Sequence, residues 1–275
     1  MQDSGYRELY IRWLQFGSML PVFRSHGTDT PREPWQFGRE DSPEYACIRE
    51  TIRLRYRLMP YLYSTAAQAC RDGLPIIRAM LTAFPEEPAI RATDDQYMLG
   101  DALLVKPVTR ALADGGDRTE VLLPAGCWFD LLSSVCYHGG RTISMPTLLD
   151  RFPVLVRAGS ILPVAEGAQS AADLPVPAKE YLVFGGADGR MELYDDVGDG
   201  YETGIRIPIE YKDAEARLDF GRIAGELHEP VKMTIRLVRP DGVRVSRQAV
   251  YDGNELSVSL DESTERETKP DETIQ

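Results

Sequence analysis

The first ninety residues alternate between helix-like and strand-like spacing of apolar positions. Leu9, Trp13 and Phe16 recur at intervals of three and four, which predicts a helix with an apolar face that Gly17 closes. The apolar run at residues 19–23 predicts a strand. It ends in a polar cluster, as a barrel strand does where its carboxyl end faces a site.

A long amphipathic helix is expected next. Ser42 is a typical capping residue, and apolar side chains keep helical spacing over residues 48–70. Pro60 interrupts this pattern and is expected to kink the helix or split it in two. Gly73 should end it, and residues 76–81 predict another buried strand.

Beyond residue 92 the pattern changes to short β-prone runs separated by glycine and proline turns. Strands are expected at residues 102–108, 119–123, 154–156 and 161–164. Residues 167–177 have the composition of a linker, and the turns at 187–189 and 240–242 predict hairpins. Residues 261–275 are acidic, lack aromatic side chains and are typical of a disordered tail.

Composition narrows the possible partners. Apolar residues make up 43% of the 275, enough for a packed core, and no stretch approaches the ~18 uncharged apolar residues of a membrane span. Lysine and arginine number 31 against 43 acids, a net charge of −12. So acidic a chain is a poor partner for nucleic acid or an anionic membrane and is compatible with a neutral ligand such as a sugar. The cellular compartment stays open, with the cytoplasm slightly favoured.

The sequence contains few features of a metal-binding or nucleotide-binding protein. The chain has no Cys-x-x-Cys pair and no histidine cluster, so no zinc site, metal or other cofactor is expected. Residues 195–200 superficially suggest a calcium loop, but Val197 and Arg206 occupy ligand positions and a turn is the better interpretation. Phosphate-binding, serine-hydrolase and zinc-protease motifs are missing from the sequence.

Sugar chemistry has candidate residues but no acid pair. Glycoside hydrolysis needs two carboxyl groups about 5–9.5 Å apart across the bond that breaks. The polar cluster at residues 24–26 contains none, so no residue of this chain is assigned a catalytic role. His26 is equally compatible with binding a sugar hydroxyl and with satisfaction by loop backbone. Trp13, Trp35 and Trp128 could each stack on a sugar, although a lone tryptophan is more often part of a core.

Several segments, in colinear order, resemble glycoside hydrolase family 31, which includes retaining α-glucosidases and α-xylosidases. They are residues 12–17, 21–27, 32–38, 54–63, 96–101, 123–128, 153–163 and 193–196. Residues 78–80 read Arg-Ala-Met where many α-glucosidases have Arg-Pro-Leu, a weak sign of the α-xylosidase-like branch.

The resemblance implies an α/β plus all-β fold: the C-terminal part of a (β/α)8 TIM barrel followed by two β-sandwich-like domains. Residues 1–92 would be the incomplete barrel, 93–170 the proximal β domain, and 171–260 the distal β domain. In the family, the histidine of the Arg-x-His motif binds the sugar at the bond to be cleaved, which points to His26, with Arg24 in support. The family's two catalytic aspartates lie on earlier barrel strands and match nothing in this sequence.

The leading hypothesis is therefore the C-terminal portion of a retaining α-glycosidase that acts on α-xylosyl or α-glucosyl linkages and is inactive alone. Expected partners are an oligosaccharide or small glycoside, the N-terminal barrel portion and, in the full enzyme, further copies of itself. One alternative is a non-catalytic sugar-binding or structural β-sandwich module. Another is a subunit that completes a barrel supplied by another chain.

Overall fold

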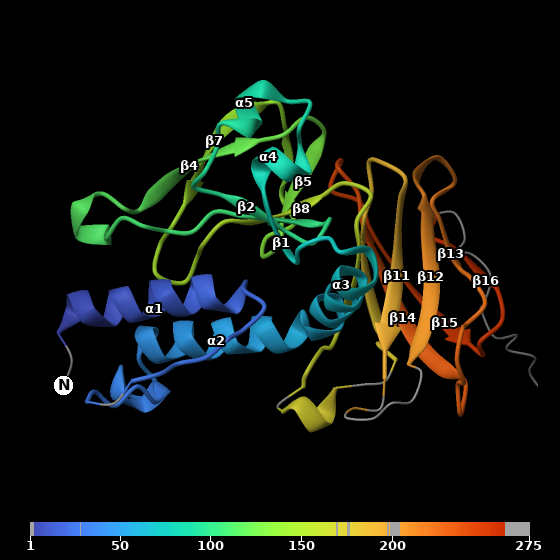
Figure 1. Cartoon of the computed structure of the whole chain (residues 1–275), viewed down its shortest axis with the longest axis horizontal. Coiled ribbons are helices and arrows are strands. Elements are labelled where there is room, and N and C mark those ends of the chain that lie inside the picture. Colours follow the sequence, from blue (N-terminus) through green and yellow to red (C-terminus); the bar gives the residue numbers. More distant parts are fainter. Residues whose placement is uncertain are drawn as a thin grey trace, which may run out of the picture.

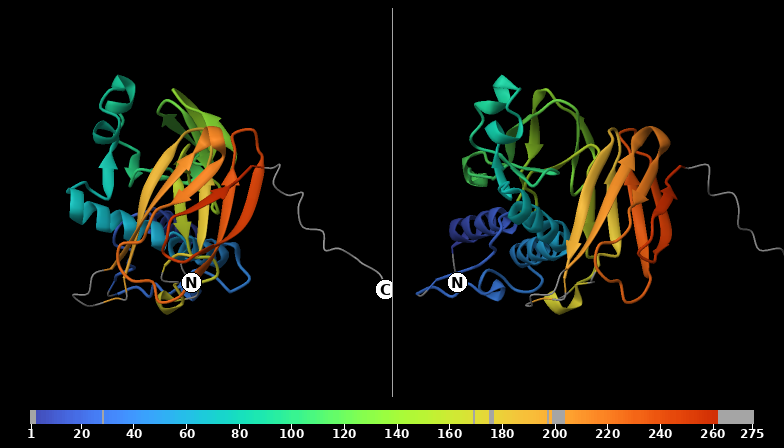
Figure 2. Two further views of the ribbon diagram at one scale, coloured as in Figure 1. Left: turned by 90° about the vertical axis from the view of Figure 1, so that its right-hand side faces the viewer. Right: turned by 45° about the vertical axis from the view of Figure 1, so that its right-hand side comes forward.

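The computed structural model describes residues 3–27, 29–168, 170–174, 177–196, 198 and 204–261. A helical part, a β part above it and a β-sandwich beside both make up the molecule (Figure 1). Figure 2 shows the same parts from two other directions, with the sandwich in front of the other two in the left view and beside them in the right view. In the described ranges no helix is long and apolar enough to cross a membrane. The predicted disordered tail lies outside these ranges from residue 262 onward.

Local signals at helix ends shape the helical part. It comprises α1 (Ser4–Ser18), η1 (Pro34–Gln36), α2 (Pro43–Arg57) and α3 (Met59–Asp72). The Ser42 hydroxyl accepts a hydrogen bond from the Tyr45 N–H at 3.2 Å, which confirms the expected cap. Pro60 lies in the first turn of α3, so the long helix is split at Leu58 as predicted. Gly73 ends α3 with a left-handed φ of 72°.

α1 is buried through a different face from the one predicted. Leu9 is 52% exposed and Trp13 is 63% exposed, so the expected apolar face points outward. The buried residues are Ile11, Arg12, Leu14, Gln15 and Ser18. Polar side chains are buried here because α1 packs on a loop, residues 147–151, whose backbone carbonyls need donors. Helical spacing alone does not reveal such a partner.

Two buried arginines fix the backbone around α1. The Arg12 guanidinium donates hydrogen bonds to three carbonyl oxygens of the 147–151 loop. The Arg55 guanidinium, from α2, donates to the carbonyl oxygens of Ser18 at 3.1 Å and Pro21 at 2.9 Å, and also to that of Leu20. Burial lowers the pKa of both side chains. The turn that follows α1 is therefore tied to α2.

The proximal β part is an antiparallel six-stranded sheet with a two-stranded sheet beside it. The first has the order β1 (Ile77–Ala79), β2 (Tyr97–Leu99), β3 (Leu103–Val105), β8 (Val154–Arg157), β5 (Cys127–Asp130) and β6 (Cys136–His138), and the second pairs β4 (Arg118–Leu123) with β7 (Arg141–Pro146). Helices α4 (Met80–Ala83) and α5 (Pro88–Arg91) and the turn η2 (Leu112–Asp114) complete it. The strand predicted at residues 76–81 is therefore shorter than expected, because α4 begins at Met80.

The distal part is a sandwich of two four-stranded sheets. One has the order β15 (Arg244–Tyr251), β14 (Val231–Val238), β10 (Glu180–Phe184) and β9 (Ile161–Val164), and the other β11 (Gly189–Asp195), β12 (Ile205–Lys212), β13 (Arg217–Phe220) and β16 (Leu256–Ser259). The short helices are η3 (Ala171–Asp173) and η4 (Asp213–Glu215). The turn at 240–242 joins paired strands, so that hairpin is confirmed. The turn at 187–189 instead connects β10 to β11 in opposite sheets, so the hairpin predicted there is wrong.

The sheets cross both predicted domain limits. β1, on the barrel side of residue 92, pairs with β2. β9, on the proximal side of residue 170, pairs with β10 of the sandwich. The division at residues 92 and 170 remains a prediction. Strand pairing continues across the first limit through β1 and β2, and across the second through β9 and β10.

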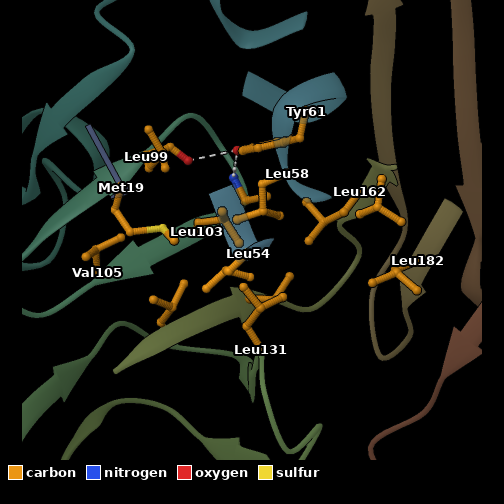
Figure 3. Close-up of a cluster of buried hydrophobic side chains, with 14 of the residues drawn as sticks. Met19, Leu54, Leu58, Tyr61, Leu99, Leu103, Val105, Leu131, Leu162 and Leu182 are labelled. Atoms are coloured by element: carbon orange, nitrogen blue, oxygen red, sulfur yellow. Dashed lines mark hydrogen bonds between the residues drawn. The ribbon is translucent and has the colours of Figure 1, made fainter. Parts of the chain in front are cut away.

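One apolar cluster joins all three parts (Figure 3). It contains Leu58 of the helices, Leu103 of the proximal sheet and Leu182 of the sandwich. At one margin of the cluster the buried Tyr61 hydroxyl donates to the Leu99 carbonyl at 2.8 Å and accepts from the Ala102 N–H at 3.1 Å. Because both backbone groups are buried, this side chain satisfies donors and acceptors that water cannot reach.

Two neighbouring carboxyl groups at the end of β11 experience opposite environments. The Asp196 carboxylate accepts hydrogen bonds from the hydroxyls of Tyr63 at 2.6 Å and Tyr194 at 2.9 Å, and the Tyr63 bond is the main cause that lowers its pKa. Burial raises the pKa of Asp195 to about 6. These groups sit where α3 meets the sandwich, so both link protonation to folding.

Replacing Arg55 tests the buried guanidinium. Arg55→Met leaves carbonyl oxygens at residues 18–21 without their donor, and we expect it to lower the free energy of unfolding by about 2–4 kcal/mol. Arg53→Met is the matched control on the same helix, because Arg53 is half exposed and pairs only with Glu50 in the described structure. We expect a change within about 0.5 kcal/mol there. Equal losses in urea unfolding for the two variants would contradict the assignment.

Asp195→Asn tests the buried carboxyl. The folded-state pKa lies above the unfolded one, so its contribution is complete below about pH 4 and is lost as pH rises through about 6. Relative to wild type, the variant should therefore gain stability between about pH 4 and pH 7, by about 1–2 kcal/mol after allowance for partial exposure. Asp196→Asn should lose stability relative to wild type as pH rises through the lowered folded-state pKa to about 4, and this deficit should then stay constant up to pH 7, because the pKa of Asp196 is lowered. Urea midpoints for both variants that change in the same direction would refute this account.

Candidate functional site

The three sequence-predicted binding residues line one hollow on the outer side of α1. Trp13, Arg24 and His26 surround a volume of about 390 Å³ together with other residues of α1 and the segment that follows it. The structure thus brings Trp13, Arg24 and His26 together, although Trp13 and His26 are thirteen positions apart in the sequence. No described residue of the lining is an aspartate or a glutamate.

One wall of the hollow is the exposed apolar face of α1. Trp13 packs edge-on against Phe16, with ring centroids 5.9 Å apart, and Phe16 packs in the same way against Tyr97 of β2 at 6.2 Å. Val22 on the opposite side is 73% exposed. Large apolar side chains gathered on a surface mark a site for a ligand or for other protein. This edge-on packing supports the Trp13 indole from one side.

The other wall is the segment at residues 20–27, which is not the strand that the apolar run predicted. Met19 is fully buried and Arg55 holds the carbonyls just after it, but residues 20–27 are bends and irregular structure. A strand needs a neighbour to complete its hydrogen bonds, and no strand of the described chain pairs with this segment. Arg24 and His26 are consequently exposed side chains on an extended surface segment.

Two residues that the sequence did not single out hold His26 in place. The Tyr10 hydroxyl donates to the Arg32 carbonyl at 2.9 Å and lies 3.2 Å from Ser25 Oγ. The Arg32 guanidinium in turn donates to the backbone carbonyl of His26. A Cβ on Gly27 would meet the Arg32 guanidinium, so a larger residue there would require the end of this flexible side chain to move. Arg32 belongs to the family-like segment 32–38, but nothing in the sequence indicated that it or Tyr10 would hydrogen-bond to backbone carbonyls near His26.

The remaining tryptophans divide between surface and core. Trp128 is completely buried and its indole N–H donates to the Pro124 carbonyl at 2.9 Å, so it is a core residue. Trp35, in η1, is 66% exposed and is not part of the lining of the hollow.

Chemically, the hollow can bind and orient but lacks an acid–base pair. An imidazole, a guanidinium and an indole suit a ligand with hydroxyl groups and an apolar ring face. In the described ranges, no three metal-binding side chains lie together in a way that could hold a metal ion. The calcium-like loop at 195–200 falls partly outside the described residues, since residues 197, 199 and 200 are not described.

Comparison with known families places two matches along the chain. The model of the "Glycosyl hydrolases family 31 TIM-barrel domain" matches residues 2–65, and that of the "Glycosyl hydrolase family 31 C-terminal domain" matches residues 73–162. The first match contains the hollow, and the second begins directly after α3.

Curated relatives and solved structures agree with these matches. An α-xylosidase from Saccharolobus solfataricus is 34% identical over 242 residues, which are 86% of this chain and 32% of that protein. Mouse neutral α-glucosidase C is 38% identical over 205 residues, 71% of this chain and 22% of that protein. The crystal structure of a family 31 α-xylosidase from Xanthomonas citri has a TM-score of 0.81 at 36% identity, covering 93% of this chain and 29% of that chain. The chain therefore spans about a third or less of the length of these relatives.

Proposed function

This chain belongs to glycosyl hydrolase family 31, and from that premise we propose that it forms the C-terminal portion of a retaining α-glycosidase for α-xylosyl or α-glucosyl linkages. The single observation that carries the proposal is the hollow in which Trp13, Arg24 and His26 meet within the segment that matches the family's barrel. In this proposal the chain contributes part of the barrel and the β domains that support it.

His26 is proposed to hydrogen-bond a hydroxyl of the sugar whose bond is cleaved. Its side chain is exposed on the rim of the hollow, while its backbone carbonyl is held by Arg32. Arg24 supports the same sugar from the adjacent wall, and the Trp13 indole offers an apolar surface to the ring. All three groups bind and orient, and none of them supplies the proton transfer or the nucleophile.

The two reacting carboxyl groups are proposed to come from outside residues 1–275. Retaining hydrolysis uses one carboxylate as nucleophile and one carboxylic acid as proton donor, about 5–5.5 Å apart. The described lining of the hollow contains neither. The exposed apolar face with Leu9 and Trp13 supports the same idea, since it offers a surface on which the remaining barrel could pack.

The isolated chain is expected to be inactive. Purified residues 1–275 should release no nitrophenol from p-nitrophenyl α-xyloside or α-glucoside above the uncatalysed rate, because the acid pair is missing from the hollow. Activity that a single Asp→Asn or Glu→Gln substitution abolishes would place the catalytic carboxyls in this chain and overturn the proposal. Saturable sugar binding that survives His26→Ala would favour a sugar-binding β-sandwich module instead.

A chimera tests the role of His26 in turnover. Residues 3–261 would replace the aligned segment of the Xanthomonas citri α-xylosidase, and kcat/KM would be measured on both aryl glycosides. His26→Ala should lower kcat/KM about 10- to 100-fold through the loss of a sugar hydrogen bond. His228→Ala is the matched control, because His228 lines a different hollow in the distal part. An active chimera in which the two substitutions have equal effects would show that His26 does not touch the substrate.

A further inference from the structure

Two cysteines and a histidine meet on the β5–β6 hairpin, far along the chain from the hollow. β6 is the last strand of the six-stranded sheet and forms its free edge in the described structure. Cys127 and Cys136 are both half-buried there, and His138 is exposed. The cluster is accessible to a small molecule from solvent, and neither the proposed function nor the family matches assign it a role.

Strand register explains why these side chains meet. Cys127 stands directly opposite His138, and Phe129 stands opposite Cys136. The ladder bonds Gly139 N–H to Gly126 O and Asp130 N–H to Val135 O flank these positions, so both are the closer, non-hydrogen-bonded kind of pair. Side chains alternate between faces, so Cys127, Cys136 and His138 share one face.

The two thiols have different neighbours, which affects how readily each reacts. Cys127 Sγ lies 3.7 Å from Nδ1 of His138, so the imidazole can accept its proton. The Cys136 side chain lies diagonally across the hairpin from that of Cys127, on the same face. Burial, together with Cys127, raises the pKa of Cys136 to about 11, so this group stays a thiol at neutral pH. Cys127 is therefore the sulfur that reacts first.

We propose that Cys127 and Cys136 form a redox-responsive dithiol that closes reversibly to a disulfide by exchange with the disulfide of a small thiol. The Cys127 thiolate, its proton passed to His138, attacks one sulfur of the small disulfide and expels one thiolate. Cys136 then passes its proton to the thiolate expelled first and attacks the Cys127 sulfur of the mixed disulfide, which expels a second thiolate that takes the proton held by His138. Two protein thiols are oxidised and one disulfide is reduced to two thiols, so electrons and protons balance.

Geometry permits this bond on the edge strand. A disulfide requires Cα atoms within about 7 Å, and diagonal positions on neighbouring strands lie near that limit. Because both side chains project from one face of the hairpin at diagonal positions, a small movement of the edge strand would bring the two sulfurs together. The other two cysteines offer an internal contrast: Cys47 is 7% exposed in the helical part, and Cys70 is exposed on α3.

The test is oxidation of the full chain with oxidised glutathione in native buffer, followed by alkylation of free thiols and peptide mass spectrometry. We expect a Cys127–Cys136 cross-linked peptide as the main product, mixed disulfide with glutathione at Cys70, and unmodified Cys47. The cross-link should form at least about tenfold faster in native buffer than in urea, because the fold holds the two sulfurs together. A rate no faster in native buffer than in urea would overturn the proposal.

Variants separate the roles within the cluster. Cys136→Ser should trap glutathione on Cys127, whereas Cys127→Ser should leave Cys136 unmodified. His138→Gln should slow cross-linking several-fold without preventing it, and the control Cys70→Ser should leave its rate unchanged. Urea midpoints equal to wild type establish that each variant is folded. Glutathione on both Cys127 and Cys136 of wild type with no cross-link, or no reaction at either while Cys70 reacts, would refute the dithiol.

Discussion

The buried cluster that contains Tyr61 is the constraint on which the other features depend. Helices, six-stranded sheet and sandwich each contribute side chains to it, so each part buries some of its apolar surface against the others, in addition to the separate cores of the sandwich and the proximal part. The Tyr61 hydroxyl satisfies a carbonyl and an N–H of the loop between β2 and β3, where a purely apolar side chain would leave both unpaired. β9 also pairs with β10 of the sandwich, so backbone hydrogen bonds add to the apolar contacts that join the parts. The three parts consequently behave as one packed body.

The candidate site takes its position from the margin of that cluster. Met19 is a member of the cluster and the last core residue before the site segment. Arg55 then binds the carbonyls of residues 18–21, which sets the direction in which the chain leaves α1. Beyond this point, the Tyr10 hydroxyl donates to the Arg32 carbonyl and the Arg32 guanidinium donates to the His26 carbonyl. These hydrogen bonds hold the backbone at His26 although its segment is not part of a sheet. Hydrogen bonds from Arg55, Tyr10 and Arg32 thus hold this segment in place of the strand pairing that its apolar sequence predicted.

Sequence reasoning succeeded where the signal was local and failed where a partner decided the outcome. Ser42, Pro60 and Gly73 act through their own backbone geometry, so the ends of α2 and α3 were predictable. The run at 19–23 has strand composition, but a strand exists only if another strand pairs with it. The buried face of α1 was missed because its partner is a set of backbone carbonyls in the distant loop at residues 147–151. The site residues Arg24, His26 and Trp13 could be named from motif resemblance, whereas Tyr10 and Arg32 required coordinates.

The contact between α1 and the 147–151 loop gives the β domains a direct effect on the hollow. Arg12 and Trp13 are neighbours on α1, one turned inward to the loop carbonyls and the other outward to the hollow. A shift of the 147–151 loop must move the Arg12 guanidinium, or leave buried carbonyls unpaired at about 1–3 kcal/mol each. Either response would rotate or translate the helix that carries Trp13. Through this loop the proximal β part thus orients the helix that forms one wall of the hollow, and the acidic groups proposed to complete it would have to be aligned to that same helix.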